Sequence, residues 1–213
     1  MLIFIIFSFI LYLIGSFPTS HIIGEKLYRI DILRIGSKHS GLSNIYQYSS
    51  KKIILLILFI DVLLKGFVPT YLVFNFYNEY ILASLFLIIG HNWSFFLNFR
   101  GGKGLSISIG LLAGVNIFIF FILVIFFLLF WIIVKLRDSA MPWILSFIIT
   151  VLVIIFDALY LHVFFQTLSK MSLYSIIFVL LLLLLRRILV DGEYNNFNLR
   201  IILNRIIFDR DEK

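Results

Sequence analysis

The sequence predicts an all-α polytopic membrane protein of about seven transmembrane helices, with the N-terminus outside and the C-terminus in the cytoplasm. Hydrophobic residues make up 62% of the 213 residues, far more than a soluble domain carries. The charges fall in short segments between apolar runs of roughly twenty residues, the length that one membrane crossing needs. Because lipid offers the backbone no hydrogen bonds, such runs are expected to be helices. We expect one membrane-embedded domain over residues 1–213.

The first apolar run, from Met1 to about Ile23, is expected to be a retained transmembrane helix. It lacks the basic start and the small-residue cleavage site of a secretory signal. Residues 23–52 then carry six cations against two acids, and such an excess marks the cytoplasmic side of a membrane. The N-terminus is therefore predicted to lie outside.

The second predicted span, Ile53–Phe74, carries two charged residues at depth. Asp61 and Lys65 are four positions apart, so both side chains share one helix face and can neutralise each other. The third span, from Tyr80 to about Phe96, follows a segment without cations and returns the chain to the cytoplasm.

The run from Leu105 to Val134 is longer than one crossing requires. A break at Gly114–Asn116 would divide it into a short helix and a full one. The cations Lys135 and Arg137 would then lie in the cytoplasm, as the positive-inside rule prefers, so we predict the break. Two further apolar runs complete the seven helices: Met141–Leu159 and Met171–Leu189.

The composition excludes several kinds of site. The chain has no cysteine, which excludes disulfides and thiolate chemistry, and its four histidines lack the spacing of a metal site. We expect no metal and no cofactor. A net charge of +7 is typical of nucleic-acid binding, yet the cations lie in short connections where membrane topology places them. No nucleic-acid partner is expected.

The segment Gly90–Gly110 is polar, glycine-rich and cationic, and it predicts an anion site. Backbone amides are bared around Lys103, just before a helix is expected to begin at Leu105, which suits a phosphate or carboxylate. A tight cytoplasmic turn accounts for the same composition equally well. The segment is not a nucleotide P-loop, because Leu97 stands where the first glycine belongs. The candidate amides are those of Gly101, Gly102 and Gly104.

A second segment rich in glycine and serine, residues 36–44, is expected on the same face of the membrane. Its amides and hydroxyls would supply donors for another anion, although a solvated turn is the commoner meaning of such a string. The tail after Arg186 is expected to share this face. The candidate donors are Gly36, Ser37, Gly41, Ser43 and Asn44.

With these motifs the chain resembles the PlsY family, bacterial membrane acyltransferases that use acyl phosphate to acylate glycerol 3-phosphate. The most specific motif reads G-H-x-x-x-x-F-x-x-F-[KR]-G-G-K-G. The resemblance implies a seven-helix fold in the bacterial inner membrane, an active site facing the cytoplasm, a role in phospholipid synthesis, and an upstream enzyme that makes acyl phosphate. The matching segments are Gly15–Pro18, Asp31–Ile32, Gly36–Asn44, Asp61–Gly66 and Gly90–Gly104.

The resemblance also implies roles for individual residues. Lys103 with the neighbouring glycine amides would bind one substrate phosphate, and Ser37 with the 36–44 turn would bind the other. No Ser-His-Asp triad is needed, because phosphate is already the leaving group of an acyl phosphate. His91 is a candidate proton acceptor or phosphate donor, although a lone histidine at a helix end is more often structural. The acyl tail would lie among apolar side chains between helices.

The chain departs from the family pattern at several positions. Lys38 and His39 replace a Gly-Asn pair, and Gln47 replaces an arginine. Near the C-terminus, Leu199–Asp211 offers Arg205 but no counterpart of the family's histidine and asparagine. Two alternatives therefore stay open: a non-catalytic relative that keeps the helical bundle, and a small anion transporter. A transporter would bind its anion near the bilayer midplane.

The topology can be tested with single cysteines in this cysteine-free chain. Ser139→Cys is expected to be shielded from an impermeant thiol reagent in intact cells, because Lys135 and Arg137 hold this segment in the cytoplasm. Asn116→Cys is expected to be labelled. Permeabilised cells, in which both cysteines should react, are the control. Ready labelling at position 139 with position 116 protected would contradict the seven-helix topology.

Overall fold

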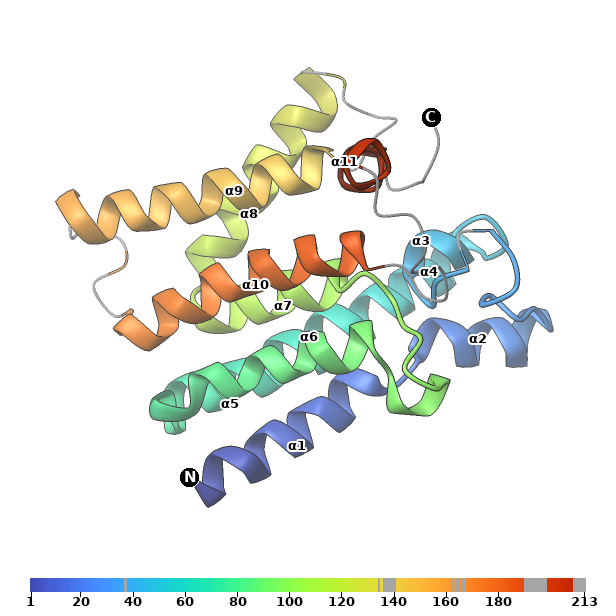
Figure 1. Cartoon of the computed structure of the whole chain (residues 1–213), viewed down its shortest axis with the longest axis horizontal. Helices are drawn as coiled ribbons and strands as arrows, with labels where there is room; N and C mark the ends of the chain where they lie inside the picture. Colours follow the sequence, from blue (N-terminus) through green and yellow to red (C-terminus); the bar gives the residue numbers. More distant parts are fainter. Residues whose placement is uncertain are drawn as a thin grey trace. The chain divides into compact units, whose positions relative to one another are not determined.

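In the computed structural model the described residues are almost entirely helical, as predicted (Figure 1). The structure describes residues 1–36, 38–133, 135, 141–161, 163, 165, 168–189 and 199–208. The chain divides into two compact units, Met1–Val115 and Asn116–Lys213. The single domain expected from the sequence stays a prediction. Several residues singled out above lie outside the described residues: Ser37, Arg137, Ser139 and Asp211.

The first unit holds the first three predicted spans and the polar segments between them. Helices α4, η1 and α5 follow one another directly and form a continuous helix of 26 residues, Lys51–Phe76. The elements of the first unit are α1 (Leu2–Ser16), α2 (Thr19–Tyr28), α3 (Leu42–Ile45), α4 (Lys51–Leu58), the π-helix η1 (Phe59–Phe67), α5 (Val68–Phe76), the 3-10 helix η2 (Asn78–Ser84), α6 (Leu85–Asn92), the 3-10 turn η3 (Phe95–Leu97) and α7 (Leu105–Val115).

The second unit holds the remaining apolar helices and a helix in the tail. Rings of Phe127 and Trp143 stack at 3.9 Å between centroids and join α8 to α9. No helix was predicted in the tail, so α11 was not foreseen. The elements are α8 (Ile117–Leu128), the π-helix η4 (Leu129–Ile133), α9 (Met141–Phe156), the π-helix η5 (Asp157–Leu161), α10 (Lys170–Ile188) and α11 (Leu199–Phe208).

Buried arginines tie α11 to α10. Arg187 donates to the carbonyl of Ile206 and Arg205 donates to that of Ile188, each at 3.2 Å. Both side chains are at most 5% exposed. Carbonyls at a helix C-terminus lack intrahelical partners, which explains why cations near these ends hold the two helices together.

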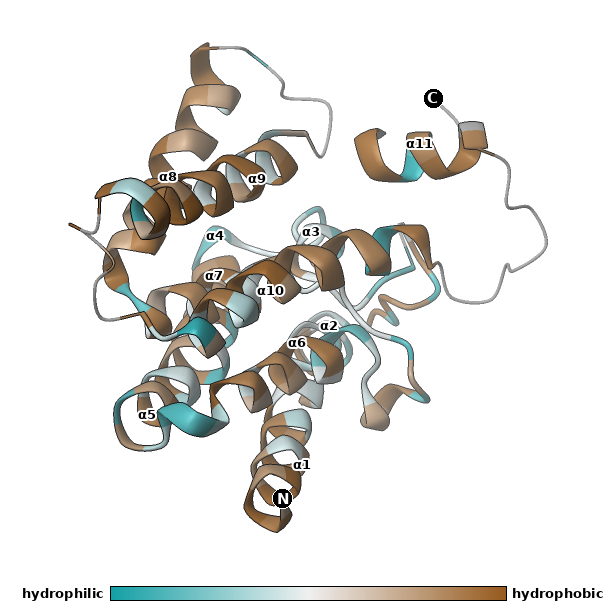
Figure 2. Ribbon diagram, turned by 60° about the vertical axis from the view of Figure 1, so that its left-hand side comes forward, coloured by the Kyte–Doolittle hydropathy of each residue, from teal (hydrophilic) through white to brown (hydrophobic). Residues whose placement is uncertain are grey.

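Four helical segments in the described part of the chain are long and apolar enough to cross a membrane, and the first comprises both α1 and α2. They are Leu2–Tyr28, Lys51–Phe76, Met141–Leu161 and Lys170–Ile188. Figure 2 shows that hydrophobic residues dominate the helices and that hydrophilic ones form short patches. The number of crossings and their orientation stay predictions.

The predicted break in the 105–134 run is confirmed. Helix α7 ends at Val115, and Asn116 adopts an extended backbone with φ −161° and ψ 124°. Its side-chain oxygen accepts a hydrogen bond of 2.8 Å from the N–H of Phe118. Asparagine is a favoured N-cap because this bond satisfies an amide that the new helix leaves unpaired, so α8 begins at Ile117.

The first predicted span is interrupted and then extended. Pro18 lacks an N–H and its ring disfavours a helical conformation at Phe17, so α1 ends at Ser16. The chain becomes helical again at Thr19 and continues to Tyr28, beyond the predicted end near Ile23. This break lies beside the candidate site described below.

Glycines let the helices of the first unit touch backbone to backbone. A Cβ at Gly15 would overlap the carbonyl of Leu87, and one at Gly90 would overlap the carbonyl of Tyr12, so α1 lies directly on α6. A Cβ at Gly110 would overlap the carbonyl of Val62, which brings α7 against η1. Close backbone contact is a usual means of packing helices in lipid.

Gly110→Ala is expected to lower the thermal unfolding midpoint of the purified protein, since the new methyl group meets a carbonyl that cannot move aside. Overpacking of this kind costs about 1 to 3 kcal/mol. Leu64→Ala is the control, because that η1 side chain is 48% exposed and supports little packing within the protein. An unchanged midpoint for Gly110→Ala would contradict the packing described here.

Candidate active site

The glycine-rich segment after η3 lies against the end of α6. The N–H of Gly102 donates to the carbonyl of His91 at 3.0 Å. A Cβ on Gly102 would overlap Nε2 of the same histidine, and one on Gly101 would overlap the carbonyls of His91 and Asn92. The half-buried imidazole therefore packs on the backbone of Gly102. The sequence placed His91 in the same motif but did not predict this contact.

The contact changes what Gly102 can do. Its N–H already donates within the protein, and the absence of a side chain makes room for His91. Anion binding by Gly102 stays a prediction. Gly104 has a φ of 76°, a left-handed backbone that favours glycine. Helix α7 begins directly after it at Leu105, as predicted. The unpaired amides and positive dipole of a helix N-terminus favour an anion, and half-buried Lys103 stands two residues before this terminus.

The 36–44 segment folds around the buried side chain of Asn44. Gly36 has a φ of 55°, and a Cβ there would overlap the side-chain oxygen of Asn44. Both residues thus shape the loop, a role that the sequence did not indicate; phosphate binding by either stays a prediction. The side-chain amide donates to the carbonyls of Ile32 (2.6 Å), Ile35 (3.1 Å) and His39 (3.1 Å).

The two glycine-rich segments meet, which confirms part of the predicted convergence. The N–H of Ser40 donates to the carbonyl of Gly101 at 3.3 Å. A Cβ on Gly41 would lie 4.0 Å from Cα of Gly102. Ser43, another candidate donor, is exposed on α3. The tail after Arg186 belongs to the second unit, so its place at this site stays a prediction.

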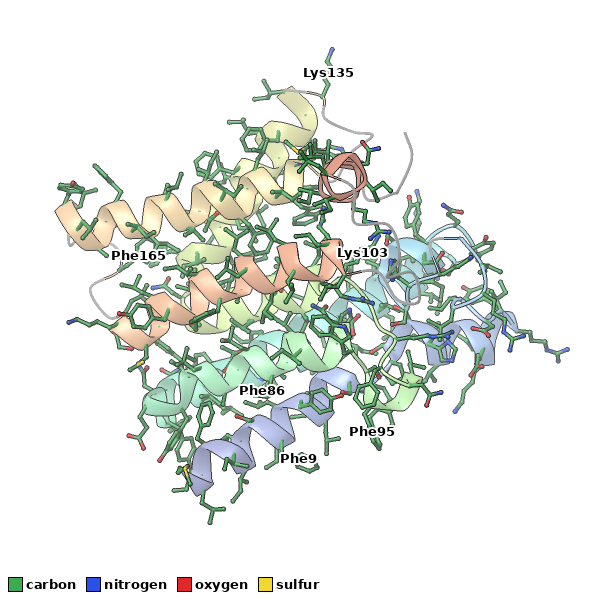
Figure 3. The ribbon with its side chains drawn as sticks, viewed as in Figure 1. Phe9, Phe86, Phe95, Lys103, Lys135 and Phe165 are labelled. Atoms are coloured by element: carbon green, nitrogen blue, oxygen red, sulfur yellow. The ribbon has the colours of Figure 1, made fainter. Side chains whose placement is uncertain are left out.

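The connection between α6 and the glycine segment is a tight turn rather than more helix. The third span was predicted to reach Phe96, but α6 ends at Asn92. The hydroxyl of Ser94 donates to the carbonyl of Ser16 at 2.5 Å, and its own carbonyl accepts from the N–H of Phe99 at 2.8 Å. These bonds to α1 and across the turn outweigh the helical tendency of an apolar sequence. Figure 3 labels Phe95, which lies in this turn, and Lys103, which lies in the segment that follows it.

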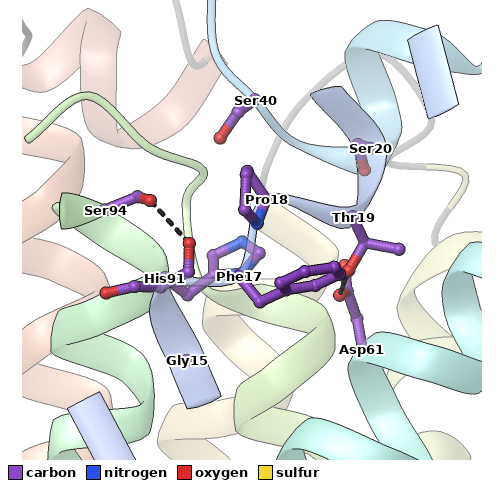
Figure 4. A pocket seen from close by; sticks show the side chains of 10 residues that line it. Gly15, Phe17, Pro18, Thr19, Ser20, Ser40, Asp61, His91 and Ser94 are labelled. Atoms are coloured by element: carbon purple, nitrogen blue, oxygen red, sulfur yellow. Dashed lines mark hydrogen bonds between the residues drawn. The ribbon is translucent and has the colours of Figure 1, made fainter. Parts of the chain in front are cut away.

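A small polar pocket lies at the break between α1 and α2 (Figure 4). Three parts of the first unit close it: the break itself, the end of α6 with its turn, and the two glycine-rich segments. The pocket is lined by Gly15, Ser16, Phe17, Pro18, Thr19, Ser20, Ser40, Asp61, His91 and Ser94. Sequence reasoning missed the serines and the threonine, although the motif Gly15–Pro18 pointed to this segment.

The predicted pairing of Asp61 with Lys65 is confirmed. Nζ of Lys65 lies 2.7 Å from Oδ1 of Asp61, and the side chains are 6% and 2% exposed. The same ammonium donates to the carbonyl of Phe17 at 2.8 Å, and the hydroxyl of Thr19 donates to Asp61 Oδ1 at 2.9 Å. The pair therefore braces the break between α1 and α2 as well as neutralising itself.

Comparison with known proteins agrees with this arrangement. The family model described as glycerol-3-phosphate acyltransferase matches residues 5–194. The chain belongs to the glycerol-3-phosphate acyltransferase family. A protein of this name from Fusobacterium nucleatum is 37% identical over 110 residues, which are 50% of this chain and 56% of that one. One from Staphylococcus aureus is 32% identical over 127 residues, covering 54% and 62%. The chain thus matches less than two thirds of the length of these relatives of the family.

Two solved structures share the fold of the family. Both are crystal structures of PlsY, described as an integral membrane glycerol 3-phosphate acyltransferase. The glycerol 3-phosphate form has a TM-score of 0.73 and 23% identity, covering 86% of this chain and 88% of that one. The lysophosphatidic acid form has a TM-score of 0.69 at the same identity, covering 86% and 87%. The predicted all-helical integral membrane fold is confirmed.

Lys65→Met is expected to lower the thermal unfolding midpoint more than the double change Asp61→Leu, Lys65→Met. The single variant leaves a buried carboxylate without its cation, and breaking a buried pair costs about 3 to 5 kcal/mol, whereas removing both charges costs much less. Glu25→Gln, which changes a carboxylate that is 56% exposed, is the control. An equal or larger loss in the double variant would show that charge neutralisation is not what stabilises this region.

Proposed function

We propose that the chain transfers the acyl group of an acyl phosphate to glycerol 3-phosphate and so makes lysophosphatidate, the first step of phospholipid synthesis. The reaction would take place in a bacterial inner membrane at a site facing the cytoplasm. The observation that most supports this proposal is that Gly101 and Gly102, His91, and Ser40 and Gly41 of the other loop lie in contact. Family membership supports the reaction.

The chemistry requires positioning more than a nucleophilic side chain. A hydroxyl of glycerol 3-phosphate attacks the acyl carbon, the bond from that carbon to the phosphate oxygen breaks, and inorganic phosphate leaves. The proton lost by the hydroxyl is taken up by the leaving phosphate, directly or through His91. The protein must hold two anions close together and orient the hydroxyl, which reduces the entropy cost of the reaction.

Charge near the glycine segments suits two phosphates. Lys103 stands before the N-terminus of α7, where the helix dipole also favours an anion. Lys38 is exposed on the other loop at a position where the family has glycine. This cation is a candidate to compensate for the family arginine that Gln47 replaces.

An apolar groove on the first unit supports a place for the acyl tail. The groove has a volume of about 360 Å³ and lies along α1 and α6. Its lining residue Tyr12 donates its hydroxyl to the carbonyl of Trp93 at 2.8 Å, so the groove ends next to the turn that carries Ser94. Its lining is Phe4, Ile5, Ser8, Phe9, Tyr12, Phe86 and Ile89.

A non-catalytic relative is the second candidate, because the tail after Arg186 has no histidine, which the family carries there. An anion transporter has less support. The charged pair at depth, Asp61 and Lys65, already bonds to itself and to the break at Phe17. Purified protein with palmitoyl phosphate and radiolabelled glycerol 3-phosphate separates enzyme from relative. The proposal expects labelled lysophosphatidate, and its absence from well-folded protein would overturn it.

Lys103→Arg is expected to preserve folding and yet reduce kcat/KM for acyl transfer about ten- to a hundredfold, the loss of one charge-assisted phosphate contact. A guanidinium fork is not equivalent to a compact ammonium held among glycines. Arg100→Lys is the matched control, since Arg100 is exposed on the same segment, and it should retain near-normal kcat/KM. If both variants have the same near-normal kcat/KM, the segment is only a connecting turn and the predicted anion site is wrong.

A further inference from the structure

We propose that the pocket at the α1–α2 break binds the hydroxyl of the phosphorylated acceptor that is not acylated. By this contact the protein would select a polyol phosphate over a simple alkyl phosphate. The inference rests on the proposed function and adds residues to it: Ser16, Ser20 and Asp61 would recognise the hydroxyl, while Thr19 and Lys65 would position the carboxylate.

The first observation is a pair of buried hydroxyls without partners. Ser16 and Ser20 line the pocket and are 1% and 2% exposed, and neither Oγ has a hydrogen bond among the described residues. A buried hydroxyl left unpaired costs free energy, and most such groups in proteins are satisfied. Two in one pocket therefore point to a polar group that binds there.

The second observation is the carboxylate of Asp61, which lines the same pocket. Oδ1 of Asp61 accepts from Lys65 and from Thr19. The other carboxylate oxygen has no hydrogen bond within the part of the chain that the structure describes, and Asp61 lines the pocket. This oxygen is a strong acceptor for an O–H donor. Because Lys65 balances its charge, the carboxylate would not repel an acceptor that carries a phosphate.

The size and place of the pocket decide which group it takes. Its interior has room for a group of about the size of one water molecule, so it admits a hydroxyl and excludes a phosphate. His91 and Ser40 form part of its lining, and both contact the segment that contains Lys103. Figure 4 shows Ser40 at the top of the pocket and Thr19 beside Asp61. An acceptor phosphate near Lys103 would thus leave the adjacent carbon's hydroxyl at this pocket.

The decisive experiment compares two acceptors in two proteins. Glycerol 3-phosphate has the extra hydroxyl, and 3-hydroxypropyl phosphate lacks only that group while keeping the hydroxyl that is acylated. Wild-type protein is expected to prefer glycerol 3-phosphate about ten- to a hundredfold in kcat/KM, the contribution of a hydrogen bond to a charged group. A double variant, Ser16→Ala with Ser20→Ala, should lower the ratio of kcat/KM for glycerol 3-phosphate to kcat/KM for the analogue at least about threefold. The cause should be a higher KM for glycerol 3-phosphate.

The double variant should fold normally, since it removes hydroxyls that have no partner in the described protein. Its unfolding midpoint should be equal to or above that of the wild type. Ser84→Ala with Ser108→Ala is the matched control: both hydroxyls are 0% exposed and lack described partners, but neither lines the pocket. This control should retain the full preference for glycerol 3-phosphate.

The outcomes separate this inference from the proposed function. If wild-type protein acylates both acceptors and the double variant keeps the full preference, the pocket holds only water and the inference is overturned. If wild-type protein acylates neither acceptor, the proposed function fails and the pocket is tested by binding instead. The inference would then be supported if glycerol 3-phosphate raises the unfolding midpoint of the wild type more than 3-hydroxypropyl phosphate does, and if this difference is lost in the double variant. Equal rises with the two compounds in the wild type would overturn it.

Discussion

Lys65 makes the hydrogen bond on which the first unit depends. From the middle of the Lys51–Phe76 helix, its ammonium reaches the carbonyl of Phe17, where Pro18 has interrupted α1. In lipid an interrupted helix needs such a substitute donor, and an ammonium needs the carboxylate of Asp61 to be tolerable at that depth. One contact therefore allows both the break and the buried charge.

The break has consequences for everything around it. It frees the carbonyl of Ser16 to accept a hydrogen bond from the hydroxyl of Ser94. This bond fixes the turn after α6, which leads into the glycine segment. Backbone contacts at Gly15 and Gly90 bring α1 close enough to α6 for this bond. The glycine segment then packs on His91 and bonds to Ser40 of the other loop. A polar site thus forms at the end of apolar helices.

This construction suits a reaction between two phosphorylated substrates. The glycines serve packing and backbone conformation at least as much as anion binding, as Gly36 under Asn44 and Gly102 under His91 illustrate. In the proposed site, the N-terminus of α7 would supplement the charge of Lys103. In the proposed reaction, the hydroxyl-lined pocket would add to this charge-based binding a means of distinguishing one acceptor from another.

The sequence by itself determined the helical membrane fold, the break at Asn116, the pairing of Asp61 with Lys65 and the membership of Gly90–Gly104 in one functional motif. Each of these follows from properties that the sequence shows directly: hydrophobic length, the placement of cations between apolar runs, i,i+4 spacing and a short characteristic pattern. Only the tertiary structure decided that Lys65 donates to the carbonyl of Phe17 and that the N–H of Gly102 donates to the carbonyl of His91. It also decided that the side chain of Asn44 bonds within its own loop, and that Ser16 and Ser20 line one pocket with Asp61. These contacts join residues far apart in the chain, and a hydroxyl or an amide has the same local signature whether it faces a ligand, a carbonyl or a neighbouring helix.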